Sequence, residues 1–359
     1  MKTSKPLVFS TIICGLFVFG CAFAKVADGM GNKHPLKEAI KQKLKKGPKK
    51  EANVPEYFAI YTATLDGKNF TEILRDPKRE MNHARVSNDH KWIVFTRYNK
   101  FNPLGIAVEE YGHYEATEIM MCRIDGSQLQ TIIPSKKGVM NANAYWTPDN
   151  KGVIYISSDN PGEKAQIYIM DLATRKRTRV PTPAGAHATD PHMVGDLLVY
   201  PRQNKKGKFL IYMMNSDGTK NKQISASNAR SKVDADPKLS PDKSKVAIFR
   251  NVEKNDWHII VVDVKSGVET DLSPSNVLEG VAEWSSDGKV LVFFHLNRKD
   301  FFGKSGLYTI RPDGSERRKI LLPSGYWYTM PAFFPGTGSG KNAKIIFSIR
   351  KLPSSLLRR

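Results

Sequence analysis

The sequence predicts an all-β protein, a six-bladed β-propeller of four-stranded antiparallel blades. Three observations lead to this fold class. A turn that contains Ser or Thr, Pro and Asp recurs at intervals of about 46 residues, each time before a β-branched and aromatic strand. A second strand that ends in Asp-Gly or Ser-Gly follows, and a short strand that ends at Ile, Val or Leu completes each unit. The two ends of the repeat region each hold half a unit, so strands from both termini would close the ring.

The clearest copies of the repeat are hairpins with turn chemistry at their tips, where Asp caps the turn and Gly or Asn supplies an unusual backbone angle. They are residues 146–149 with 153–156, 239–242 with 246–249, and 284–288 with 290–293, and a weaker copy is 86–89 with 92–95. The aligned turn positions are Asp89, Asp149, Asp196, Asp242, Asp287 and Gly336. Their spacings of 60, 47, 46, 45 and 49 residues predict one unit per blade.

The two ends of the repeat region complete one another. Residues 57–61 form the back half of a unit that lacks its front, and residues 330–349 form a front half that lacks its back. The first spacing is long because residues 98–116 form an aromatic-rich insertion, which either stacks against sugar rings on the ligand-binding face or packs on its own blade. The sequence therefore predicts a single propeller domain over residues 55–359.

The amino-terminal segment predicts export. Lys2 and Lys5 precede an apolar run over residues 7–23, and Ala-Phe-Ala follows at 22–24, which is typical of a signal peptide cleaved after Ala24. A retained membrane helix is disfavoured because the run reaches only about 17 residues. We expect an exported bacterial protein, periplasmic or secreted, with a signal peptide over residues 1–24.

Two further features follow from the amino-terminal segment. Residues 18–21 resemble a bacterial lipobox, which would place a lipid anchor on Cys21, although residue 19 is bulkier than that pattern normally has. Residues 25–54 form a lysine-rich leader, either solvated or tethered to an anionic surface. If cleavage follows Ala24, only Cys122 remains, so no internal disulfide can form and we expect a buried, inert thiol.

The charge balance points to an anionic partner. The 359 residues contain 56 Lys and Arg against 35 Asp and Glu, a formal net charge of +21, and loss of the two signal lysines leaves +19. Such an excess favours association with anions. Nucleic acid would satisfy the charge, but predicted export argues against it.

Two segments carry a family resemblance. Residues 236–242, Asp-Pro-Lys-Leu-Ser-Pro-Asp, and residues 310–314, Ile-Arg-Pro-Asp-Gly, resemble the repeat of the TolB-type six-bladed propeller family. The resemblance spans the repeat region and implies the propeller architecture. Related propellers resemble scaffolds, peptidase lids and, more distantly, lyases of uronic-acid polysaccharides, so the resemblance leaves the function open.

Arginines recur where the second strand of each unit ends, near the face on which propellers bind ligands. Four of the six units place an arginine within three residues of the strand's terminal aromatic residue, namely Arg97, Arg202, Arg250 and Arg350. Converging guanidinium groups would bind carboxylate or sulfate in a bidentate manner. Asn143 and Tyr326 are expected to join them in binding substrate. Alternatively, the arginines point outward or pair with acidic residues that lead into the innermost strands, namely Asp190, Asp234, Asp236 and Glu283.

Three histidines and a tyrosine fall near the same predicted face. In β-elimination from a uronate, Arg neutralises the carboxylate, His or Tyr removes the α-proton, and Tyr or His protonates the leaving oxygen. The candidate catalytic residues are His83, His187, His295 and Tyr328. The alternative for each histidine is a core or capping role. His187 and His192 would need a third ligand to hold a metal, so no metal site is predicted and the cofactor stays unknown.

Two functions of different classes are consistent with these observations. The recurring basic strand exits favour the first, an exported lyase that binds an acidic, uronate-containing or sulfated polysaccharide and cleaves it by β-elimination. The alternative is a non-catalytic TolB-like scaffold for protein or cell-envelope interactions. The sequence contains no phosphate-cradling glycine loop, serine elbow, paired zinc cysteines or dinucleotide fingerprint. We expect a monomer whose partner is an anionic polysaccharide, with no transmembrane segment after signal removal.

Overall fold

The computed structural model describes residues 58–98, 117–159, 165–183, 186–226, 233–253, 256–275, 277–297 and 305–351. Twenty-four strands and no helix occur in these ranges, which confirms the all-β class. No helix in the described ranges is long and apolar enough to cross a membrane. The predicted signal peptide, Cys21, the lysine-rich leader and the insertion after Tyr98 lie outside the described residues.

Three four-stranded antiparallel sheets follow one another along the chain. The first contains β3 (Glu80–Val86), β4 (Trp92–Tyr98), β5 (Thr117–Arg123) and β6 (Gln130–Ile133). The second contains β7 (Asn141–Trp146), β8 (Gly152–Ser157), β9 (Gln166–Asp171) and β10 (Arg177–Arg179). The third contains β11 (His192–Val194), β12 (Leu197–Gln203), β13 (Phe209–Asn215) and β14 (Lys222–Gln223).

The next eight strands form two antiparallel four-stranded halves of one larger sheet. One half contains β15 (Asp234–Leu239), β16 (Lys245–Glu253), β17 (Asp256–Asp263) and β18 (Glu269–Asp271). The other contains β19 (Val277–Trp284), β20 (Leu291–Asn297), β21 (Gly306–Ile310) and β22 (Arg318–Lys319). A single parallel pair, Trp257 with Leu278, joins β17 to β19, so the four-stranded unit of the repeat is retained in each half.

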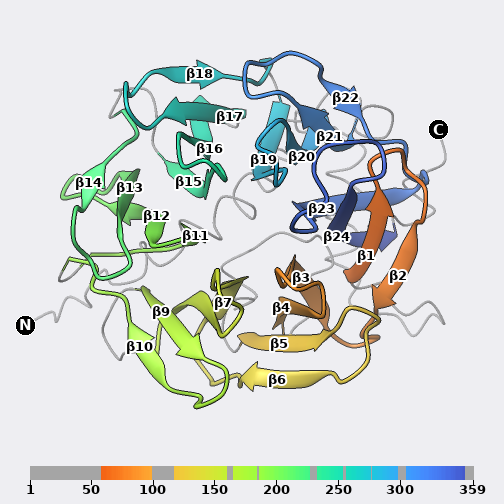
Figure 1. Cartoon of the computed structure of the whole chain (residues 1–359), viewed down its shortest axis with the longest axis horizontal. Coiled ribbons are helices and arrows are strands. Elements are labelled where there is room, and N and C mark those ends of the chain that lie inside the picture. Colours follow the sequence, from red (N-terminus) through yellow and green to blue (C-terminus); the bar gives the residue numbers. More distant parts are fainter. Residues whose placement is uncertain are drawn as a thin grey trace, which may run out of the picture.

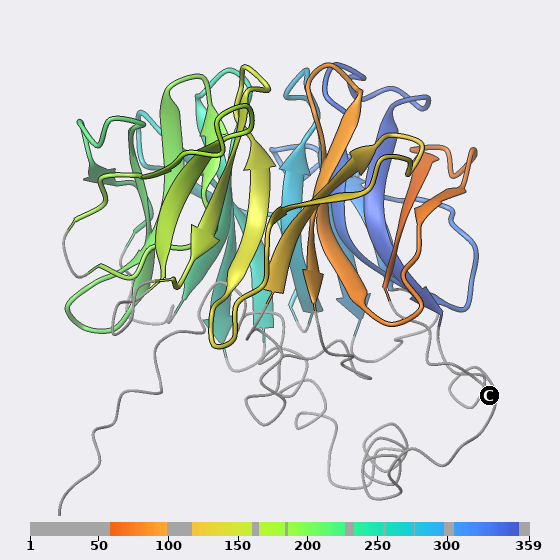
Figure 2. The same ribbon diagram turned by 90° about the horizontal axis from the view of Figure 1, so that it is seen from below.

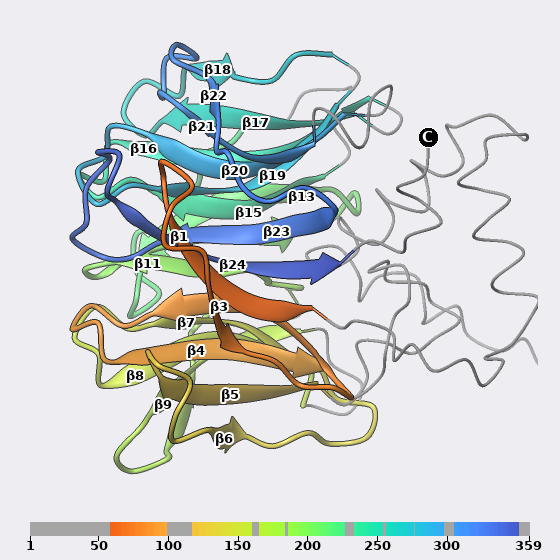
Figure 3. The same cartoon turned by 90° about the vertical axis from the view of Figure 1, so that its right-hand side faces the viewer.

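Strands from both ends of the described chain share the remaining sheet. Its strands are β1 (Ala59–Thr64), β2 (Thr71–Leu74), β23 (Tyr326–Phe333) and β24 (Lys344–Lys351), in the order β2-β1-β24-β23. The register runs from Ala59 opposite Ile349 to Thr64 opposite Lys344. Figure 1 shows β1 and β2 in orange beside the blue β23 and β24, and Figure 3 shows the same sheet from the side.

The sheets are arranged around a central axis (Figure 1), and their strands run between two faces of the molecule (Figure 2). The first strand of each unit lies nearest the axis, and the fourth strand lies outermost. These first strands are β3, β7, β11, β15, β19 and β23. Apolar side chains fill the seams between neighbouring sheets. Ile346 of β24 packs with Phe95 of β4, and Phe347 of β24 packs in one cluster with Phe294 of β20, so the shared sheet is packed on both sides.

The turn motif adopts one hydrogen-bond pattern in all four copies that the sequence singles out. In the first copy the Ser87 hydroxyl donates to Asp89 at 2.6 Å and accepts from the Trp92 amide at 3.0 Å. Three other copies repeat this pair of bonds, around Thr147 with Asp149, Ser240 with Asp242, and Ser285 with Asp287. The side chains replace backbone partners that the tight turn lacks, which is why the motif recurs at each hairpin tip.

Candidate functional site

Each innermost strand is distorted at the same place. Six residues adopt left-handed backbone angles, with φ between 41° and 57°, in or just before the first strand of each unit. They are His83, Asn143, Asp190, Asp236, Val281 and Met330. Each lies six residues before an aligned turn position, so their spacings are again 60, 47, 46, 45 and 49 residues. Register shifts accompany five of them, as expected for β-bulges, which redirect side chains.

Charged side chains next to these bulges meet in a buried network, which we call the central polar cluster. Arg85 of β3 lies 2.9 Å from Glu283 of β19 and donates a 2.7 Å hydrogen bond to the Tyr145 hydroxyl of β7. That hydroxyl donates to Glu283 at 2.8 Å. The Lys238 ammonium of β15 lies 5.2 Å from the centre of the Tyr145 ring. Four innermost strands are thus tied together by buried charge.

The cluster holds its charged groups in defined ionisation states. Burial raises the pKa of Glu283, but Arg85 and Lys238 outweigh it, so the pKa is lowered and the carboxylate stays ionised. Burial likewise opposes the charge on Lys238, yet the pKa is raised because Tyr145 and Glu283 surround the ammonium. Burial lowers the pKa of His192 to about 4, which keeps this imidazole neutral at pH 7.

A second pair of acids lies close to the cluster. Burial and the neighbouring Asp236 carboxyl raise the pKa of Asp190 to about 7, and burial also raises the pKa of Asp236. The Asn143 amide donates a hydrogen bond to Asp190. Two side-chain oxygens here, Asn143 Oδ1 and Asp190 Oδ2, have no hydrogen-bond partner among the described residues. No three His, Cys, Asp or Glu side chains within the described ranges are grouped so that they could hold a metal ion.

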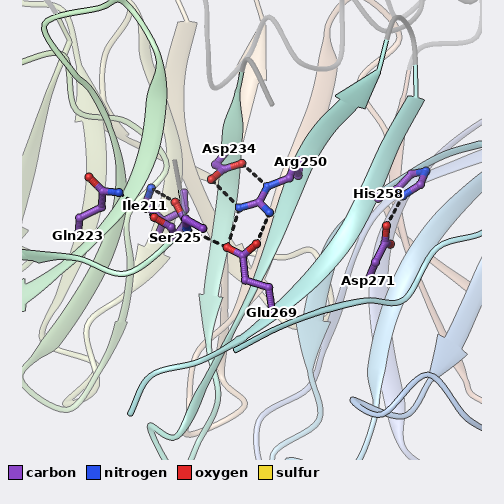
Figure 4. Close-up of polar contacts among 9 residues, drawn as sticks. Ile211, Gln223, Ser225, Asp234, Arg250, His258, Glu269 and Asp271 are labelled. Atoms are coloured by element: carbon purple, nitrogen blue, oxygen red, sulfur yellow. Dashed lines mark hydrogen bonds and ion pairs between the residues drawn. The ribbon is translucent and has the colours of Figure 1, made fainter. Parts of the chain in front are cut away.

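The predicted substrate-binding arginines lie where the second strands end, and three of them form salt bridges. Arg250 makes bidentate contacts with Asp234, at 2.7 and 3.0 Å, and with Glu269, at 2.5 and 2.9 Å (Figure 4). Arg97 lies 2.7 Å from Glu118, and Arg350 lies 3.2 Å from Glu80. The sequence-based alternative of pairing with acids is therefore observed at Arg250, whose partner Asp234 it named.

Arg202 and Tyr326 contact aromatic rings. The Arg202 guanidinium carbon lies 3.5 Å from the centre of the Tyr212 ring, and the Tyr326 ring lies 6.4 Å from the ring of Phe70. Cation–π contact of this kind covers the ring and orients the guanidinium. Asn143, the remaining predicted binding residue, is buried at its bulge in the network with Asp190.

The four predicted catalytic side chains belong to different four-stranded units and have different neighbours. His83 is buried, and burial and Arg85 hold its pKa well below the usual range. The His187 ring is buried 5.2 Å from the ring of Phe209. His295 contacts the Glu279 carboxylate, which also pairs with Arg317 at 2.5 Å.

Tyr328 is tied to the backbone of the preceding loop. Its hydroxyl donates a 2.5 Å hydrogen bond to the Pro323 carbonyl, and burial raises its pKa. Cys122, expected to be inert, is buried, and burial raises the pKa of its thiol to about 12.

Sequence reasoning missed Arg85, Tyr145 and Lys238. Arg85 and Lys238 each stand two residues after a bulge position, and the tryptophans of two repeat motifs donate to their carbonyls: Trp146 Nε1 to Arg85 and Trp284 Nε1 to Lys238, at 2.9 and 2.8 Å. A charged residue two positions after the bulge of an innermost strand was the sequence signal that could have identified Arg85 and Lys238. Glu118 and Glu269 had no such signal, because they lie on other strands than the arginines they neutralise.

The fold and the buried polar cluster define a β-propeller whose innermost strands are linked by a buried ion pair, hydrogen bonds and a cation–π contact. The model of the TolB beta propeller domain matches residues 45–335. This chain belongs to that family, which confirms the resemblance carried by its repeats.

Solved structures agree with this assignment. TolB from Acinetobacter baumannii is 20% identical with a TM-score of 0.59, and the match covers 84% of this chain and 71% of that one. A putative TolB from Agrobacterium tumefaciens is 13% identical with a TM-score of 0.60 and coverages of 83% and 99%. Oligogalacturonate lyase from Vibrio parahaemolyticus is a more distant match, with 11% identity, coverages of 83% and 98% and a TM-score of 0.46. At these identities the likeness concerns the fold alone.

Proposed function

We propose that this protein acts by binding a partner and is not a catalyst. The observation that carries the proposal is the neutralisation of three of the four strand-exit arginines and of His295 by carboxylates. Arg97, Arg250 and Arg350 pair with carboxylates, and His295 pairs with Glu279. A uronate would have to displace these acids, and separating a buried ion pair leaves a charge in the protein without its partner, which is costly.

The surroundings of the candidate catalytic groups support the same proposal. A general base must come within hydrogen-bond reach of the proton that it removes. His83 and His187 are 5% and 0% exposed, which leaves a polymer little access to either ring. The Tyr328 hydroxyl already donates to a backbone carbonyl, and burial raises its pKa, so it is a poor base near neutral pH.

β-Elimination from an acidic polysaccharide stays a prediction of the sequence, based on the positive charge and on His83, His187, His295 and Tyr328. Its test is to incubate the full chain with polygalacturonate, alginate and heparin and to follow ultraviolet absorbance from unsaturated products. We expect no product above the protein-free control. Turnover that is lost in a His295→Gln variant would overturn the non-catalytic proposal.

The remaining expectations are proposals about the whole chain. We propose that six four-stranded units form a closed ring, because the sheet of β1, β2, β23 and β24 packs against both of its neighbours.

We also propose a monomer, exported by a signal peptide over residues 1–24 and carrying a leader over 25–54. Mass spectrometry of the mature protein should find Lys25 at the amino terminus, and a retained segment or a lipid on Cys21 would contradict cleavage after Ala24.

A further inference from the structure

Exposed cations gather on the outer strands of two neighbouring sheets. Residues 171–179, which include β10, carry four cations and one acid, and residues 215–223, which include β14, carry two cations and one acid. We call five exposed members of this group the outer basic surface: Arg175, Lys176, Arg179, Lys220 and Lys222.

The two parts of the outer basic surface lie on consecutive sheets. β10 and β14 are neighbours on the outside of the ring (Figure 1). The turn before β14 packs on the segment after β10, because a Cβ added to Gly218 would lie 2.6 Å from Pro181 Cγ. A long ligand can therefore contact both outer strands at once.

Four of the five cations of the outer basic surface have no carboxylate partner among the described residues. Arg175, Lys176, Lys220 and Lys222 form no salt bridge with a carboxylate in the part of the chain that the structure describes.

Other outer strands differ in this respect. Residues 263–271, which include β18, carry three acids and one cation. On β22, Arg318 pairs with Glu316 at 2.8 Å, and just before it Arg317 pairs with Glu279 at 2.5 Å. On β10 and β14 the exposed cations thus outnumber the acids, whereas on β18 the acids are in excess and on β22 Arg317 and Arg318 are paired with glutamates.

We propose that the outer basic surface binds an acidic polysaccharide. Alternate residues on a strand lie about 7 Å apart, so the surface offers closely spaced cations to an extended chain with repeated negative charges. Exposed Thr174, Thr178 and Gln223 lie among the cations and supply hydrogen-bonding groups for sugar hydroxyls. This binding site does not depend on whether the molecule also cleaves its ligand.

A membrane surface fits these residues less well. Proteins that lie on membranes insert apolar side chains between basic ones. The large exposed apolar residues among those described, Leu129, Val268 and Leu321, lie next to other outer strands. A polar ligand in solution is therefore the better match to the outer basic surface.

The test measures binding of the full chain to fluorescently labelled polygalacturonate and heparin by anisotropy, at low and at physiological salt. The test variant carries Arg175→Gln, Lys176→Gln, Lys220→Gln and Lys222→Gln. The control carries Lys243→Gln, Lys265→Gln, Lys289→Gln and Lys341→Gln, which removes the same charge from exposed positions on other sheets. Vesicles of phosphatidylglycerol and phosphatidylcholine serve as a membrane probe, and circular dichroism checks folding.

We expect the test variant to lose at least tenfold in affinity for one of the polymers, and the control to change less than twofold. Equal losses in both variants would overturn the proposal, because net charge and not this surface would then govern binding. It would also be overturned if wild type bound neither polymer, or bound only the anionic vesicles. Cleavage of the polymer is followed separately by absorbance. Cleavage would contradict the non-catalytic proposal, but the comparison of binding between the two variants would still test the outer basic surface.

Discussion

At the scale of single residues, Arg250 is held between two carboxylates rather than aimed at a ligand. Its side chain is 4% exposed, that of Asp234 is 0% exposed and that of Glu269 is 19% exposed. The sequence predicted where this arginine stands, because the repeat fixes the end of each second strand. It could not predict Glu269, which reaches Arg250 from β18 only after the strands pair.

Replacing Arg250 should therefore destabilise the fold. We expect Arg250→Gln to lower the free energy of unfolding by about 3 kcal/mol or more, because the buried Asp234 carboxylate and the partly buried Glu269 carboxylate are left without their cation. Adding Asp234→Asn should recover part of the loss. Arg311→Gln, which breaks an exposed pair with Glu316, should cost less than about 1 kcal/mol. Denaturant titration measures the free energy of unfolding of each variant. An Arg250→Gln variant as stable as wild type would contradict the structural role of Arg250.

Asp190 should make the folding stability of the protein fall as the pH rises. Burial and Asp236 raise its pKa from 3.8 to about 7, while Lys238, Asn143 and Thr189 act in the opposite direction. A raised pKa in the folded state means that the folded protein binds more protons than the unfolded chain. The stability from this group is complete below the unfolded pKa and is lost as the pH rises through the folded value.

Replacing Asp190 with Asn removes this titration. We expect Asp190→Asn to gain stability relative to wild type between about pH 4 and pH 7 and to keep that gain above pH 7. Thermal melts of both proteins across this range measure the difference. A difference that does not change with pH would show that Asp190 is ionised in the folded protein throughout.

At the scale of the element, the innermost strand is the part of the repeat that the sequence described least. The hairpin tips were predictable because Ser, Thr, Asp and Gly have local preferences at turns. The bulge at His83, Asn143 and their equivalents was not, because the residues that adopt it share no chemistry: Val281 and Met330 occupy the same position as Asp190 and Asp236. A bulge depends on strand pairing and central packing, which no local pattern encodes.

Gly280, beside one of these bulges, tests how tightly the innermost strands pack. A Cβ at this position would lie 2.6 Å from Phe249, whose ring stacks on Trp257 with centroids 4.6 Å apart. We expect Gly280→Ala to destabilise the protein by about 1–3 kcal/mol through overpacking. Gly340→Ala meets nothing within 4 Å and should be near neutral. Equal stability of the two variants, measured by denaturant titration, would contradict this packing.

At the scale of the whole molecule, β1 and β2 complete a sheet that the last strands begin. The sequence predicted this arrangement from two incomplete half-units, and β1 pairs with β24 along its whole length. The positive charge was harder to place. Composition gives only its amount, whereas pairing of individual cations with carboxylates decides where charge stays available, as it does on β10 and β14.

Two truncations separate the leader from the shared sheet. Removing residues 1–54 should leave the melting temperature unchanged, because the leader lies before the first strand. Removing residues 1–75 deletes β1 and β2 and leaves β24 as an unpaired edge, so we expect a lower melting temperature and aggregation. If both truncations melt like the full chain, the ends do not close the fold.

We have proposed that this propeller binds an acidic ligand and does not cleave it. One calorimetric titration of the full chain with polygalacturonate, followed by sizing of the recovered polymer, tests it most directly. We expect saturable heat of binding and polymer of unchanged length without unsaturated ends. Shortened polymer with unsaturated ends would contradict it.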